Sequence, residues 1–102
     1  MSTFVKVAST HELAPGQGKL VELESKRIAL FRVGDRYYAI DDLCPHRGGP
    51  LSEGDLEGEA VVCPWHGAIF DLATGAVVRH PAAAGVTTYA VRVEGEQIEI
   101  AV

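Results

Sequence analysis

The sequence predicts an all-β protein in which short antiparallel strands are joined by glycine-rich turns. Apolar and polar residues alternate over short runs, as they do in strands with one buried face. The 11 glycines and 5 prolines lie largely between those runs. The expected strands are Phe4–Val7, Lys19–Glu24, Lys26–Val33, Arg36–Asp41, Ala60–Cys63, Gly67–Leu72, Thr88–Val93 and Gln97–Val102. A length of 102 residues suits one domain, residues 1–102.

The turns between these strands have recognisable sequences. Ser9 is followed three residues later by Glu12, the spacing of a capping box, so one helical turn is expected after the first strand. Pro15 and Gly16 end that turn. Gly34-Asp35 predicts the turn between two central strands.

The C-terminal part is expected to form two more strands. Residues 88–93 are expected to form a single strand with Tyr89, Val91 and Val93 on one face, because side chains alternate at period two. Glu94-Gly95 provides the turn to the last strand.

The middle of the chain differs from this pattern. Glycine, proline and acidic residues dominate residues 42–58, so we expect an irregular loop there. A second loop follows the strand that ends at Cys63. Each loop carries one cysteine and one histidine, and functional groups are commonly held on loops of a rigid sheet.

Composition excludes several classes of function. The formal net charge of −5 argues against nucleic acid, which requires a basic face. The first ten residues do not resemble a signal peptide, and no run approaches the ~20 apolar residues of a membrane helix. We therefore expect a cytoplasmic protein that has no membrane partner. A disulfide between the two cysteines is disfavoured in that reducing compartment.

The chemistry is expected at Cys44, His46, Cys63 and His66. Sixteen residues separate the pair Cys-x-His from the pair Cys-x-x-His. Zinc and a mixed-ligand [2Fe–2S] cluster both accept two thiolates and two imidazoles. Because each pair contains one cysteine and one histidine, the pattern favours two inequivalent irons, one bound by both cysteines and the other by both histidines. A zinc site remains the alternative.

The segments 44–51 (C-P-H-R-G-G-P-L) and 63–71 (C-P-W-H-G-A-I-F-D) resemble Rieske-type ferredoxins of bacterial ring-hydroxylating oxygenase systems. The likeness extends over nearly the whole chain. It implies a three-sheet antiparallel Rieske fold in which loops at about 42–51 and 63–70 hold one [2Fe–2S] cluster. In this family each ligand histidine binds iron through one ring nitrogen and exposes the other at the surface.

The resemblance also implies a function. The protein is expected to be an electron carrier rather than an enzyme, taking electrons from a flavoprotein ferredoxin reductase that uses NAD(P)H. The acceptor is expected to be a terminal Rieske oxygenase. The chain lacks the G-x-G-x-x-G unit of a nucleotide-binding fold. Transient contacts with both partners suit a monomer.

Two positions predict a low reduction potential within the Rieske range. In the high-potential members of the family that this chain resembles, Ser and Tyr hydroxyls donate hydrogen bonds to cluster sulfurs. The matching positions here are Ala68 and Phe70, and neither has a hydroxyl. Hydrogen bonds to the sulfurs stabilise the added charge of the reduced state, so their loss lowers the potential.

Several further residues have two interpretations. Trp65 could shield the cluster or dock a partner, or simply pack its loop, and Pro81 could cover the cluster or form a turn. His80 and Arg47 could act near the cluster or lie in solvent. An acidic run could be a solvated loop or a docking patch; its members are Glu53, Asp55, Glu57 and Glu59. Alternative functions are the small subunit of a nitrite reductase or of another redox assembly, and a zinc-stabilised interaction domain.

Overall fold

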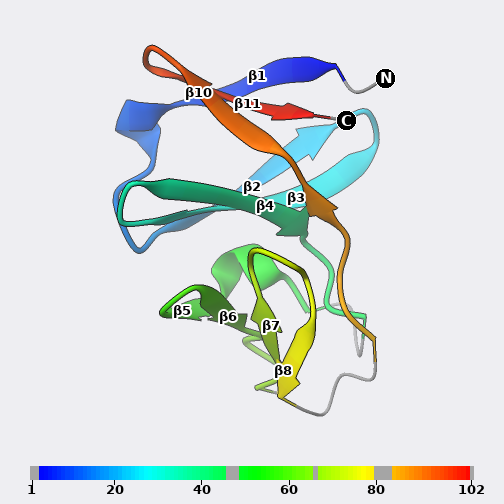
Figure 1. Ribbon diagram of the computed structural model, residues 1–102. Coiled ribbons are helices and arrows are strands. Elements are labelled where there is room, and N and C mark those ends of the chain that lie inside the picture. Colours follow the sequence, from blue (N-terminus) through cyan, green and yellow to red (C-terminus); the bar gives the residue numbers. More distant parts are fainter. Residues whose placement is uncertain (1–2, 46–48, 66, 80–83, 102) are drawn as a thin grey trace.

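The computed structural model describes residues 3–45, 49–65, 67–79 and 84–101, which form three antiparallel sheets (Figure 1). The terminal sheet has the strand order β1 (Phe4–Ser9), β11 (Gln97–Ala101), β10 (Val91–Glu94). The central sheet has the order β2 (Gly18–Leu23), β3 (Lys26–Val33), β4 (Arg36–Asp41), β9 (Thr88–Tyr89). The loop sheet has the order β5 (Asp55–Glu57), β6 (Ala60–Val62), β7 (Ile69–Asp71), β8 (Val77–Arg79). The all-β prediction is confirmed.

Helical structure in the described residues is limited to two single 3₁₀ turns, η1 (Thr10–Glu12) and η2 (Leu51–Glu53). None of it is long and apolar enough to cross a membrane. The capping box of η1 is confirmed, since the Ser9 backbone N–H donates to Glu12 Oε2 at 2.7 Å and Ser9 Oγ accepts from the His11 N–H at 3.3 Å. The helical turn ends at Glu12, before the turn at Pro15 and Gly16.

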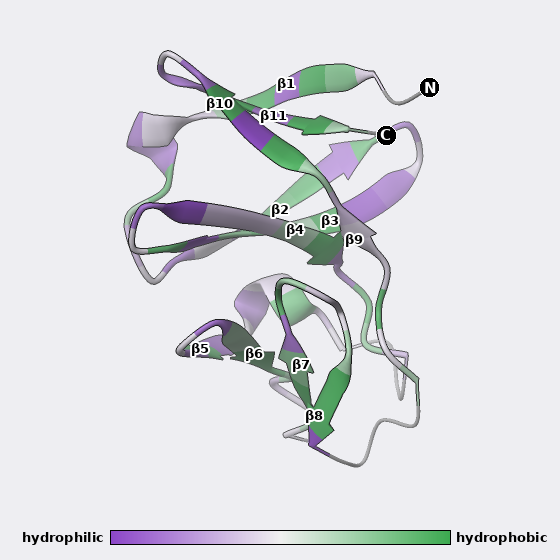
Figure 2. Cartoon of the chain, viewed as in Figure 1, coloured by the Kyte–Doolittle hydropathy of each residue, from purple (hydrophilic) through white to green (hydrophobic). Residues whose placement is uncertain are grey.

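The central sheet is the middle layer and has a core on each face. Ile28 and Leu30 pack toward the terminal sheet, together with Ile98 and Ile100 of β11. The alternate residues of β3, Ala29 and Phe31, pack toward the loop sheet. Because both faces of β3 are covered, four consecutive apolar residues are fully buried. Figure 2 shows that β10, in contrast, carries hydrophobic and hydrophilic segments in turn.

The prediction of one strand over 88–93 is wrong. The segment divides at Ala90: Tyr89 pairs with Ala39 in the central sheet, whereas Val91 pairs with Ile100 in the terminal sheet. The Ala90 carbonyl accepts a hydrogen bond from the Ala101 N–H at 2.9 Å. The segment therefore links two sheets.

The prediction that residues 42–58 are irregular throughout is also wrong, since they contain η2 and β5. Strand β5 pairs with β6 through the tight turn that includes Gly58. Gly54 permits this packing, because a Cβ there would lie 2.1 Å from the Val62 carbonyl oxygen. Strand β8, which the sequence did not predict, completes the sheet.

The β2–β3 turn is strained, which predicts a stabilising substitution. Glu24 and Ser25 have φ of 50° and 67°, a left-handed conformation that favours Asn and Gly. The double variant Glu24→Asn/Ser25→Gly should raise the free energy of unfolding by about 1 kcal/mol, because it relieves this strain. Urea denaturation measures the change, and an unchanged or lower midpoint would contradict the prediction.

Tyr89 of β9 donates a hydrogen bond to Asp41 at the end of β4, three residues before Cys44, and this contact predicts a pH dependence. Burial, and then the hydrogen bond from its hydroxyl to Asp41 Oδ1 at 2.6 Å, raise the pKa of Tyr89 to about 12. An unfolded tyrosine has a pKa of about 10, so this contribution to stability is complete below pH ~10 and lost as the pH rises toward ~12. Urea midpoints measured over that range should fall less steeply for Tyr89→Phe than for the parent; identical slopes would refute the assignment.

Candidate metal centre

The two cysteines lie in loops that the sheets hold at fixed positions. Cys44 follows β4, and its backbone N–H donates to the Gly49 carbonyl at 2.8 Å, next to the bridge between Leu43 and Pro50. Cys63 follows β6, and its N–H donates to the Ala68 carbonyl at 2.7 Å. Each cysteine is therefore at the start of a closed, hydrogen-bonded loop.

Gly49 brings the two loops into contact. A Cβ on this buried residue would lie 2.9 Å from Cys63 Sγ and 3.1 Å from Trp65 Cγ. Cys44 and Cys63 are 2% and 1% exposed, belong to the same apolar cluster, and are not joined by a disulfide. Two buried thiols on touching loops suit a metal group bound by both loops. The two thiols therefore fit the cysteine half of the predicted mixed cysteine and histidine centre.

Four residues of the expected centre or its neighbours, His46, Arg47, Gly48 and His66, lie outside the described residues, as do His80 and Pro81. The structure thus brings together the cysteine half of the expected ligand set. The positions of the two histidines remain predictions from the sequence.

Ala68 and Phe70 form the wall beside Cys63. Both are fully buried and belong to the apolar cluster that contains the two cysteines. Neither side chain can donate a hydrogen bond to a sulfur, so the structural premise of the low-potential prediction holds at both positions.

Exposed apolar side chains flank the buried thiols. Trp65 is 57% exposed although its ring contacts Gly49, and Leu43, next to Cys44, is 49% exposed. Large exposed apolar side chains beside a functional site are typical of contact surfaces. This exposure favours a docking or covering role for Trp65 over simple packing.

The acidic run extends from η2 through β5 to the turn before β6, and all four of its side chains are exposed. Asp55 and Glu57 are on β5, so this part of the run is a strand and not a solvated loop. Glu59 accepts a hydrogen bond from the Tyr38 hydroxyl at 2.9 Å and lies 3.6 Å from Arg36. Its charge is thus partly compensated within the chain.

Sequence reasoning missed Asp42, the one charged residue among those described whose side chain is fully buried. Its Oδ1 accepts from the Ser52 N–H at 2.8 Å, and its Oδ2 lies 3.6 Å from Arg27 Nη2. The sequence offers only a weak signal for this, an Asp-Asp pair at the end of a strand.

The contact at Gly49 predicts the effect of a small substitution. Gly49→Ala should destabilise the loops by about 1–3 kcal/mol, because its methyl group would overlap Cys63 Sγ. The visible absorption of the protein should bleach faster on storage in air. Gly58→Ala is the control, since it strains an open turn with no atom within 4 Å of the new Cβ. Equal bleaching rates for the two variants would contradict the prediction.

Comparisons with known proteins identify the family of the chain. The family model described as Rieske [2Fe-2S] domain matches residues 3–90. The ferredoxin component of the naphthalene 1,2-dioxygenase system of Pseudomonas aeruginosa is 34% identical over 97 residues, covering 95% of this chain and 93% of that protein.

Two solved structures are also similar. The complex of reduced oxygenase and oxidized ferredoxin in carbazole 1,9a-dioxygenase contains a chain with a TM-score of 0.90 and 32% identity, covering 96% of this chain and 92% of that chain. A Mycobacterium tuberculosis chain assigned as the small subunit of an NADH-dependent nitrite reductase has a TM-score of 0.90 and 25% identity, covering 100% of this chain and 96% of that chain. The family match favours a [2Fe–2S] cluster over the alternative of a zinc site. The chain belongs to the Rieske [2Fe-2S] family, and its cofactor is one Rieske-type [2Fe–2S] cluster.

Proposed function

We propose that this protein is a low-potential Rieske ferredoxin that carries single electrons from an NAD(P)H-dependent flavoprotein reductase to a terminal ring-hydroxylating oxygenase. It is an electron-transfer component and not a catalytic enzyme. The observation that carries the proposal is the contact of two cysteine loops through Gly49, which buries both thiols beside exposed Trp65.

The proposed ligands are Cys44 and Cys63 on one iron and His46 and His66 on the other. When bound, the cluster supplies a centre that gains and loses one electron. The residues around it exclude water from the sulfurs, because the cysteines are packed in the apolar cluster with Ala68. We propose that residues 1–102 form a single Rieske domain with cluster-binding loops at about 42–51 and 63–70.

The proposed acceptor is supported by the similar ferredoxin that is seen in complex with an oxygenase. The exposed side chains of Leu43 and Trp65 give the site an apolar rim suited to a short-lived contact. The flavoprotein donor follows from the family resemblance. The proposal includes a monomer in the cytoplasm, where the reduced nicotinamide cofactor is available, and a role in aromatic hydrocarbon catabolism.

Reconstitution tests the proposal. The purified holoprotein is combined with NADH, a ferredoxin reductase and the oxygenase component of an aromatic dioxygenase, with naphthalene and carbazole as test substrates. We expect oxygenated product only when all components are present. If the reductase reduces the protein but the reduced protein passes no electrons to any oxygenase tested, the proposed acceptor is wrong.

The nitrite reductase assignment is the second candidate, because one structural neighbour carries it. The same reduced protein is therefore offered to a nitrite reductase large subunit. Nitrite-dependent reoxidation in the absence of oxygenase activity would favour this candidate.

A further inference from the structure

Asp42 stands at the start of the first cysteine loop and accepts hydrogen bonds from two residues at the end of that loop. Its carbonyl accepts a hydrogen bond from the Leu51 N–H at 2.6 Å, and its Oδ1 accepts from the Ser52 N–H at 2.8 Å. The side chain is fully buried. Burying a carboxylate costs free energy unless the charge is paired, so the buried position of Asp42 requires an explanation.

Arg27 is the counter-ion, but it compensates Asp42 incompletely. The Arg27 carbonyl accepts from the Asp42 N–H at 2.9 Å, which fixes the two residues side by side. Their charged groups are 3.6 Å apart, and Oδ2 accepts no hydrogen bond from any described residue. The Arg27 side chain is 47% exposed, whereas that of Asp42 is 0% exposed.

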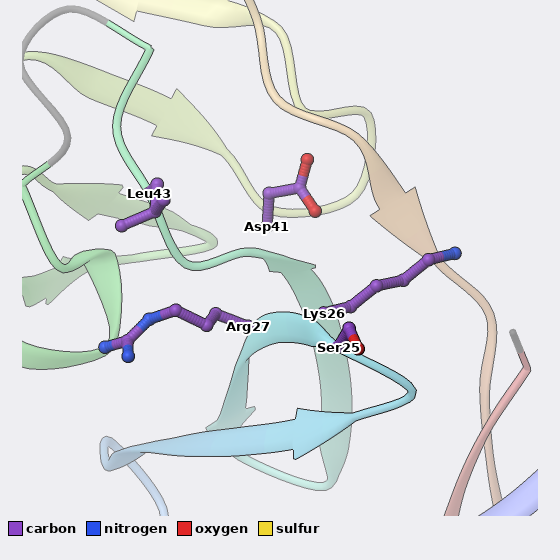
Figure 3. Close-up of a pocket in the computed structure, with 5 residues that line it drawn as sticks. All are labelled: Ser25, Lys26, Arg27, Asp41 and Leu43. Carbon is purple, nitrogen blue, oxygen red and sulfur yellow. The ribbon is translucent and has the colours of Figure 1, made fainter.

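The Arg27 side chain reaches an open pocket (Figure 3). Arg27 and Leu43 line an open pocket of about 280 Å³, together with Ser25, Lys26 and Asp41. Water in this pocket screens the guanidinium, whereas the buried carboxylate is screened much less. The pair therefore leaves a net negative field inside the protein at the base of the first cysteine loop.

We propose that Asp42 lowers the reduction potential of the cluster through its buried negative charge, and that Arg27 sets how much of this charge is felt. The inference rests on the proposed function. Asp42 and Cys44 are two residues apart, so their Cα atoms are separated by at most about 7.6 Å. Reduction adds one negative charge to the cluster, and the charge of a buried carboxylate on the same loop opposes that addition. Asp42 is thus a positioning residue with a second, electrostatic role.

A set of charge variants distinguishes the electrostatic role of Asp42 from its structural role in closing the first cysteine loop. Asp42→Asn keeps an oxygen for the Ser52 N–H and removes the charge. At a fixed ambient potential, we expect this variant to show an about tenfold higher ratio of reduced to oxidised protein than the parent. This corresponds to a midpoint shift of about +59 mV for one electron. Arg27→Gln should shift the midpoint the opposite way, and the double variant should lie between the two single variants.

Asp35→Asn is the matched control, because it makes the same change in net charge at an exposed turn. That turn lies at the end of the β3–β4 hairpin opposite to Asp42. The midpoint of this variant should equal that of the parent. A loop-closing role alone would alter cluster retention without producing midpoint shifts of opposite sign in the two single variants.

The outcomes are distinguishable from failure of the proposed function. If the parent protein has a Rieske spectrum and reduces an oxygenase, but Asp42→Asn and Asp35→Asn have equal midpoints, this inference is overturned and the function stands. If Asp42→Asn does not retain its cluster, Arg27→Gln decides: a lower midpoint supports the inference, and an unchanged midpoint overturns it.

Discussion

Replacing Cys63 by serine is expected to give a protein that folds but has lost its visible absorption and at least nine-tenths of its iron. The Cys63 thiol is 1% exposed and faces Gly49 of the other loop. A thiolate binds iron strongly, whereas a serine hydroxyl stays protonated at neutral pH and is a poor substitute. Iron and acid-labile sulfide analysis of the anaerobically purified variant measures the loss.

The matched control for this variant is Val61→Ala. Val61 is fully buried on β6, in the same apolar cluster as Cys63. Its truncation should lower the free energy of unfolding by about 1–3 kcal/mol and leave the iron content unchanged. Full iron content in Cys63→Ser would remove this residue from the ligand set.

Introducing two hydroxyl groups at the wall of the site is expected to raise the midpoint potential. In Ala68→Ser/Phe70→Tyr, each hydroxyl could donate to a cluster sulfur, and a hydrogen bond to a charged group contributes about 1.5–3 kcal/mol. Since about 59 mV corresponds to 1.4 kcal/mol for one electron, the pair should raise the midpoint by an order of 100–200 mV. Both positions are fully buried beside the cysteines.

A control variant and the midpoint of the parent protein test whether the hydroxyl groups cause that shift. Ala68→Val adds bulk without a donor and should leave the midpoint near that of the parent protein. The parent should lie low in the Rieske range of about −150 to +300 mV. A parent midpoint above about +100 mV, within that range, or no shift in the double variant, would show that these hydroxyls do not control the potential.

The sequence predicted the strands best where the burial pattern is local. The bounds of β3 and β4 match the prediction, because alternation and the Gly34-Asp35 turn are both visible in the sequence. The division at Ala90 was missed because no glycine or proline marks it, and because it depends on pairing with two strands distant in the chain. Strand β5 was missed because a three-residue strand with one apolar side chain resembles a polar loop.

The site was predicted in part for the same reason. The cysteine and histidine spacing is a property of the sequence, so the candidate ligands could be named from it. The contact of Gly49 with Cys63 and the burial of Asp42 depend on how two loops and a central strand meet in three dimensions. No local pattern contains that arrangement, which is why these two residues required the structure.

Quantifying iron and inorganic sulfide in the anaerobically purified parent protein, with its visible spectrum before and after dithionite, tests the central claim most directly. A shared centre on the two cysteine loops predicts two irons and two sulfides per chain and a coloured protein that bleaches on reduction. A colourless protein without iron, or one that contains a single zinc ion, would contradict the claim.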